Sequence, residues 1–66
     1  MRDPNRIPEI LAEIGKIWMN NPDLRLMQLL DNALIQQEEV GIGFDMFYVE
    51  DELVLRALKE FSKKYP

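Results

Sequence analysis

An apolar repeat over residues 7–18 is the first regular pattern along the chain. Apolar residues recur there at the i, i+3, i+4, i+7 spacing that places side chains on one stripe of an α-helix. Pro8 lacks the amide hydrogen that a helix already one turn long requires, so the sequence predicts a separate turn over residues 3–7 and a helix that begins near Pro8. Asn20 and the Asn-Pro pair that follows it predict the end of this helix. The stripe, which its spacing assigns to the core, consists of Ile7, Ile10, Leu11, Ile14, Ile17 and Trp18. For Trp18 the alternative is an interface anchor.

A second helix is predicted from Asp23, the expected N-cap, to about Gln37. At 100° per residue its apolar side chains cover an arc of about 160°, which is wider than one packing partner requires. The width predicts that this helix lies between the other two, with Leu30 among the most buried residues. The arc consists of Leu26, Met27, Leu29, Leu30, Ala33 and Leu34.

Leu24 and Ile35 lie outside this arc and nearly in line with each other. Together they predict a second, smaller apolar spot on the same helix. Isolated exposed apolar residues are also ordinary on protein surfaces. The pair is therefore either a contact for another chain or plain surface.

The segment over residues 40–48 is the least regular part of the sequence. Gly41 and Gly43 interrupt the helical pattern, and the strict alternation of apolar residues is typical of an extended piece. Because no second strand is predicted, the sequence favours an ordered loop whose aromatic residues fold back onto the helices, with strand pairing to another chain as the alternative. The alternating residues are Val40, Ile42, Phe44 and Met46.

A third helix is predicted from about Glu50 to Lys63. Acidic residues at its start and lysines at its end agree with the helix dipole, each contributing about 0.3 to 1 kcal/mol. The predicted fold is thus all-α, a single three-helix domain over residues 1–66 with an irregular apolar loop between helices two and three. The apolar face of the third helix consists of Leu53, Val54, Ala57, Leu58 and Phe61.

The composition removes most catalytic chemistry. The chain contains no histidine, cysteine or threonine, and Ser62 is its only serine, so thiolate and imidazole metal sites and histidine-activated nucleophiles are excluded. Gly41 and Gly43 form a GxG without the further residues of a phosphate-binding loop. The sequence therefore predicts that the protein is not an enzyme and has no cofactor or metal site.

The net charge of −4 is unevenly distributed. Residues 26–55 contain seven acidic residues and no lysine or arginine. Such a region is either a face for a basic partner or a solubilising surface.

One side of the second helix is polar and carries no acid over about 80°. Its guanidinium and amide side chains are those that make bidentate contacts with guanine and adenine, and the preceding Asn-Asn-Pro-Asp segment has the length of a helix-turn-helix turn. The acidic residues that flank and follow this side oppose binding to phosphates. A helix-turn-helix-like DNA-binding protein is therefore the alternative function. The side consists of Arg25, Gln28, Asn32 and Gln36.

Four segments together carry a resemblance: MRDPNRIPEIL, then a tryptophan, then NPDLRLMQLL and FYVEDELV. This combination resembles a family of small uncharacterised bacterial and prophage-encoded proteins whose members share RDP-x-RI, a tryptophan before PD-x-R-x-x-Q-L, and FY-x-ED-x-x-L. The resemblance implies a bacterial or prophage setting and no particular activity. As helix-end residues, Asp3 and Asp23 are expected to cap helices, and Arg6 or Arg25 to pair with carboxylates. The matching residues are Arg2, Asp3, Pro4, Arg6, Ile7, Trp18, Pro22, Asp23, Arg25, Gln28, Leu29, Phe47, Tyr48, Glu50, Asp51 and Leu53.

The expected function is non-enzymatic protein interaction or regulation. No segment has the length of a signal peptide's apolar region or of a membrane span, so a cytoplasmic protein without a membrane partner is expected. A chain of 66 residues has little interior for so many apolar side chains, which favours a homodimer. The candidate interface residues are Leu24, Ile35, Ile42 and Phe44.

Overall fold

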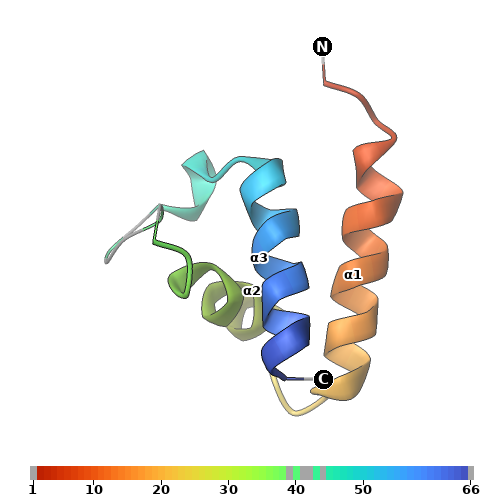
Figure 1. Cartoon of the computed structure of the whole chain (residues 1–66), viewed down its shortest axis with the longest axis vertical. Helices are drawn as coiled ribbons and strands as arrows, with labels where there is room; N and C mark the ends of the chain where they lie inside the picture. Colours follow the sequence, from red (N-terminus) through yellow and green to blue (C-terminus); the bar gives the residue numbers. More distant parts are fainter. Residues whose placement is uncertain (1, 39, 41–42, 44, 66) are drawn as a thin grey trace.

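The computed structural model describes residues 2–38, 40, 43 and 45–65, which form three α-helices and one short 3₁₀ helix (Figure 1). These elements are α1 (Arg6–Asn20), α2 (Leu26–Ile35), η1 (Met46–Tyr48) and α3 (Asp51–Lys64). The described residues include no strand. The predicted all-α, three-helix fold is confirmed.

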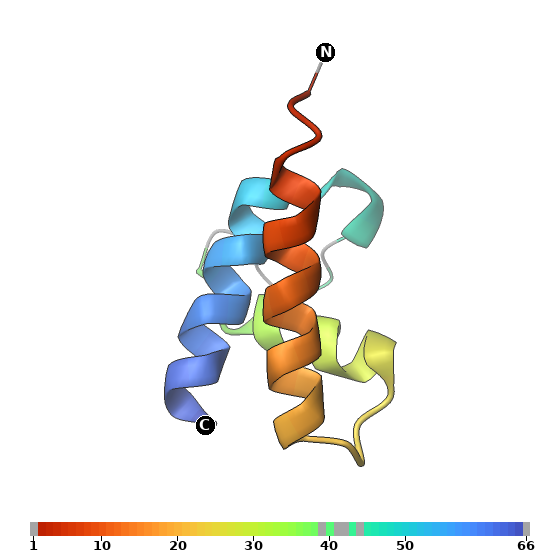
Figure 2. The same ribbon diagram turned by 90° about the vertical axis from the view of Figure 1, so that its right-hand side faces the viewer.

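The helix α3 is the element that packs against both of the others. Figures 1 and 2 show α1 and α3 side by side and running in the same direction, with α2 lying across them. The extensive contacts between described elements join α2 to α3 and α1 to α3. The prediction that the second helix is central is therefore wrong. Its wide apolar arc is only partly covered, since Leu26 and Met27 remain 37% and 58% exposed.

The buried core is formed by all three helices. Leu29 of α2 and Leu58 of α3 are fully buried. Leu30, predicted to be among the most buried residues, is only half-buried and packs against the edge of this cluster. Successive helical residues differ in direction by about 100°, so the position of α3 decides which of two adjacent leucines faces inward. The core consists of Ile17, Leu29, Ala33, Leu34, Ala57, Leu58 and Phe61.

The helix α1 begins at Arg6, earlier than predicted, and includes Pro8 in its first turn. The first amide groups of a helix have no acceptor within it, so a proline there loses no hydrogen bond. Before the helix, the Asp3 Oδ1 atom accepts a hydrogen bond of 2.9 Å from the Asn5 amide. Asp3 therefore stabilises the preceding turn, and Asn5 occupies the N-cap position.

The helix α2 is shorter than predicted, because it starts after Arg25 and ends at Ile35. Asp23, predicted as its N-cap, lies in the preceding turn. Leu24, which would be the first residue of a helix capped by Asp23, lies before α2, and its carbonyl accepts the indole N–H of Trp18 at 2.8 Å. The Arg25 amide instead donates to Gln28 Oε1 at 2.9 Å, which caps the helix two residues later than expected.

The segment between α2 and α3 does not fold its described aromatic residues onto the helices. Met46 packs against the core, whereas Phe47 and Tyr48 are 84% and 75% exposed. Asp45 accepts the Phe47 amide at 2.9 Å and fixes the 3₁₀ turn, in which successive side chains point about 120° apart. Only one of the three can face inward, so the predicted folding back of the aromatics is wrong here. The predicted candidates Ile42 and Phe44 lie outside the described residues.

Candidate protein-interaction surfaces

One side of α1 presents a continuous uncharged surface, here called the outer face of α1. All of its residues are exposed. At 100° per residue they cover an arc of about 140° without a charged side chain. Monomeric proteins rarely expose a continuous apolar face of this kind, which marks it as a candidate binding surface. The outer face consists of Ile7, Pro8, Leu11, Ala12, Gly15, Trp18 and Met19.

Three residues of this face were predicted to belong to the core. Ile7, Leu11 and Trp18 are 46%, 61% and 37% exposed, so that prediction is wrong for these positions. The other half of the predicted stripe, Ile10, Ile14 and Ile17, packs against or belongs to the core. The apolar spacing correctly identified an amphipathic helix, but it does not reveal how many neighbours cover the stripe. Here α3 covers one half of the stripe, while α2 crosses behind α1 and makes its extensive contacts with α3 (Figure 2).

Trp18 anchors one end of the outer face. Its indole N–H is held by the Leu24 carbonyl at 2.8 Å, which fixes the ring while 37% of the residue stays exposed. Together with Gly15, Met19 and Pro22, the ring lines a shallow hollow of about 400 Å³. A fixed, partly exposed tryptophan beside a hollow is typical of an interface anchor.

Opposite charges border the outer face along one edge. Glu9 lies one turn before the middle of the helix, and its Oε1 atom is 3.3 Å from Lys59 Nζ of α3. Lys16, two turns further on, is exposed and forms no ion pair within the part of the chain that the structure describes. Both groups are accessible to a molecule that covers the outer face.

A second hollow, of about 400 Å³, brings together two of the predicted interface residues. Leu24 is half-buried against the core, and Ile35 is 56% exposed. Both line this hollow, beside Phe61 and Tyr65 of the α3 end, so their predicted proximity is confirmed. Asn32 and Gln36 line the same hollow, although the sequence places these two residues on a separate polar face.

The residues of the predicted nucleic-acid face are all exposed on or next to α2. Two of their amide oxygens are already engaged, because Gln28 Oε1 accepts the Arg25 amide and Gln36 Oε1 accepts Lys64 Nζ at 3.1 Å. Both contacts lie within the protein. The four residues are Arg25, Gln28, Asn32 and Gln36.

An ion-pair cluster joins the start of the chain to the start of α3. Arg6 Nε lies 2.6 Å from Asp51 Oδ2, and Arg2 lies 2.9 Å from Glu50 Oε2. These residues come from the first and last of the quoted motifs and are more than forty positions apart in the sequence. The expected pairing of Arg6 with a carboxylate across helix ends is confirmed, and its role here is to hold α1 beside α3.

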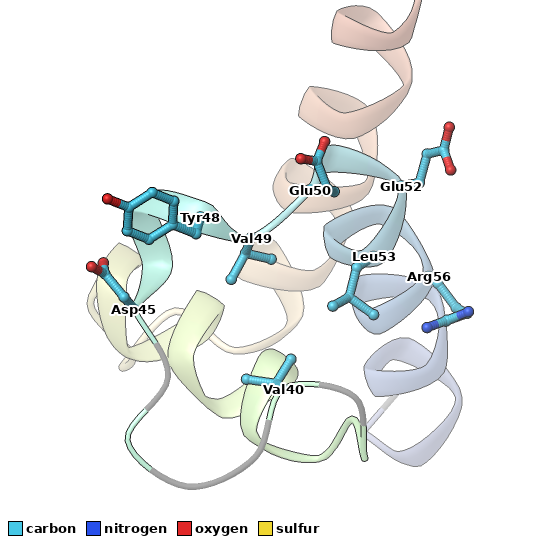
Figure 3. A pocket seen from close by; sticks show the side chains of 8 residues that line it. All are labelled: Val40, Asp45, Tyr48, Val49, Glu50, Glu52, Leu53 and Arg56. Atoms are coloured by element: carbon cyan, nitrogen blue, oxygen red, sulfur yellow. The ribbon is translucent and has the colours of Figure 1, made fainter.

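A third hollow, of about 570 Å³, has an apolar floor formed by Val40, Val49 and Leu53 (Figure 3). Carboxylates stand on its rim, but Figure 3 shows Asp45 and Glu52 at opposite ends of it. Among the described residues, no group of three or more carboxylates is placed to hold a metal ion. This arrangement offers apolar contact rather than coordination chemistry.

No protein-family model, curated protein sequence or solved structure matches this chain. Over the residues that the structure describes, no helix is long and apolar enough to cross a membrane.

Proposed function

We propose that this chain is a small, non-enzymatic interaction protein of bacterial or prophage origin that binds another polypeptide through the outer face of α1. A regulatory role toward a host or phage protein in the cytoplasm belongs to the same proposal. The observation that carries it is the exposure of Ile7, Leu11 and Trp18 on one continuous uncharged side of a helix. Covering that side removes apolar surface from water, at roughly 25 cal/mol per Å².

The chemistry of the chain supports binding rather than catalysis. Without histidine or cysteine, proton transfer and nucleophilic attack would depend on carboxylates, amines and hydroxyls alone. The floor of the 570 Å³ hollow is apolar, and its rim carboxylates Asp45 and Glu52 stand apart. No cofactor is required for this proposal.

The test is affinity capture from a bacterial lysate by the wild type and by a surface variant. Leu11→Glu places a charge in the middle of the outer face, at a residue that is already 61% exposed, so the fold should tolerate it. We expect the captured partner to be reduced by about tenfold or more, because the new carboxylate would be buried without a pair. Quantitative mass spectrometry of the bound fraction measures the difference.

Met27→Glu is the matched control, since Met27 is 58% exposed on α2 and lies outside the outer face of α1. This variant should retain the captured partner at the wild-type level. Equal recovery by the wild type and Leu11→Glu would contradict the proposed function, and so would a chain that retains no protein above bare resin and does not self-associate.

DNA binding is the second candidate, favoured by the exposure of all four residues on the polar side of α2. The chain carries 12 acidic against 8 basic residues, which opposes the phosphate contacts that drive such binding. We expect no retention of duplex DNA in a gel-shift assay at about 0.1 M salt. A shift that the Arg25→Ala, Asn32→Ala double variant abolishes would instead establish the DNA-binding function.

A further inference from the structure

We propose that the polypeptide bound by the outer face of α1 is a second copy of this chain, with the two α1 helices antiparallel about a two-fold axis between residues 12 and 13. This inference rests on the proposed function and names its partner. Two features of the described surface carry it: the order of the apolar residues along the helix and the positions of the two charges at its edge.

The apolar residues of the outer face are self-complementary in this register. An antiparallel pair with its axis between residues 12 and 13 places Ile7 of one copy beside Trp18 of the other, because both lie equally far from the axis. The same operation places Trp18 beside Ile7 on the opposite side, as an isologous contact requires. The exposed side chains of Ile7 and Trp18, at the two ends of the face, therefore meet each other across the contact.

The centre of the contact allows the two helices to approach. Leu11, 61% exposed, lies next to the axis, and the small residues Ala12 and Gly15 lie beside it. A Cβ atom added at Gly15 would meet no atom within 4 Å, so the space above this part of the helix is open. The backbones are not kept apart here by large side chains of the same chain.

The edge charges select the same register independently. Glu9 and Lys16 are equidistant from the axis between residues 12 and 13, each about 5 Å along the helix from it. In an antiparallel two-fold pair, one edge of a helix meets the same edge of its copy. Glu9 therefore lies opposite Lys16 of the second copy, and Lys16 lies opposite Glu9. A parallel two-fold pair would place this charged edge on opposite sides of the contact in the two copies, so neither Glu9 nor Lys16 would meet its counterpart.

Sedimentation equilibrium of the full chain over a wide micromolar concentration range tests the association. The wild type should form dimers, and Leu11→Glu should raise the dissociation constant about tenfold or more, since the axis places both new carboxylates in one contact. Far-ultraviolet circular dichroism of each variant shows whether helicity is retained. Ile35→Glu, in the hollow shared with Leu24, is the control and should leave the dimer unchanged.

Charge exchange tests the register. Glu9→Lys and Lys16→Glu each replace two attractive contacts by two repulsive ones, so each variant alone should dimerise roughly threefold to tenfold more weakly. An equimolar mixture of the two variants restores opposite charges at every contact and should recover wild-type association as a heterodimer. Glu9→Lys also loses the Lys59 contact of its own chain, but Lys16→Glu does not, so agreement between the two excludes an effect through α3.

A wild type that remains monomeric throughout the range would overturn the inference. So would a dimer that Ile35→Glu dissociates and Leu11→Glu does not, or single charge variants that the mixture fails to rescue. The proposed function is tested separately by capture. If the chain is monomeric in the centrifuge and Leu11→Glu loses a captured partner, the proposed function stands, but the partner is not a second copy of this chain.

Discussion

Replacing Leu58 by alanine is expected to leave the protein largely unfolded at room temperature. Leu58 lies on α3, the helix that packs against both of the others, and its side chain is fully buried. Truncating such a leucine costs about 2 to 5 kcal/mol, from lost apolar burial and the cavity left behind. A domain of this size rarely has more than about 3 to 5 kcal/mol of stability in total. Urea unfolding followed by circular dichroism measures the loss.

Met27→Ala is the matched comparison, because it also shortens an apolar helical side chain but at a position that is 58% exposed. Its free energy of unfolding should stay within about 0.5 kcal/mol of the wild type. If Leu58→Ala unfolded at the same denaturant concentration as Met27→Ala, the central position of α3 would be refuted.

The second large effect is expected at Gln37, the one buried polar side chain among the residues that the structure describes. Gln37, 7% exposed, donates from Nε2 to Glu60 Oε2 at 2.7 Å and so ties the segment after α2 to α3. Glu60→Ala leaves this amide without its acceptor. The free energy of unfolding should fall by about 1 to 3 kcal/mol, the penalty for an unsatisfied buried donor. A denaturation curve at neutral pH provides the value.

Glu60→Gln keeps an acceptor oxygen at the same place and should recover most of that loss. A double-mutant cycle adds Gln37→Ala, alone and together with Glu60→Ala, to isolate the pair from the effects of the two residues separately. Losses that simply add in the double variant would show that the two side chains are not coupled in solution.

The helices themselves were largely predictable because their signals are local. Glu50 at the start of α3 and Lys63 near its end were assigned to within one residue. The errors at the other ends have separate causes. At the start of α2, Gln28 accepts the Arg25 amide and the Leu24 carbonyl accepts Trp18, contacts that the spacing does not show. Pro8 is tolerated in α1 because its missing amide hydrogen has no acceptor there.

The candidate surface was only half predictable. The sequence identified Leu24 and Ile35 as a spot outside the main arc, and they do line one hollow. It assigned Leu11 and Trp18 to the core, because periodicity defines an apolar stripe without counting the neighbours available to cover it. Similarly, no local signal relates Arg6 to Asp51, whose contact depends on how α1 and α3 lie together.

By itself the sequence determined the three helices, the loop between the second and third, and the absence of imidazole and thiol chemistry. All of these follow from residue type and from spacing over a few turns. Only the tertiary structure decided that α3 is central, that Leu29 rather than Leu30 is fully buried, and that the outer face of α1 stays exposed. The reason is that burial is a property of the neighbours: each helix fixes the directions of its side chains, and the crossing of α2 over α3 selects which of those directions is covered.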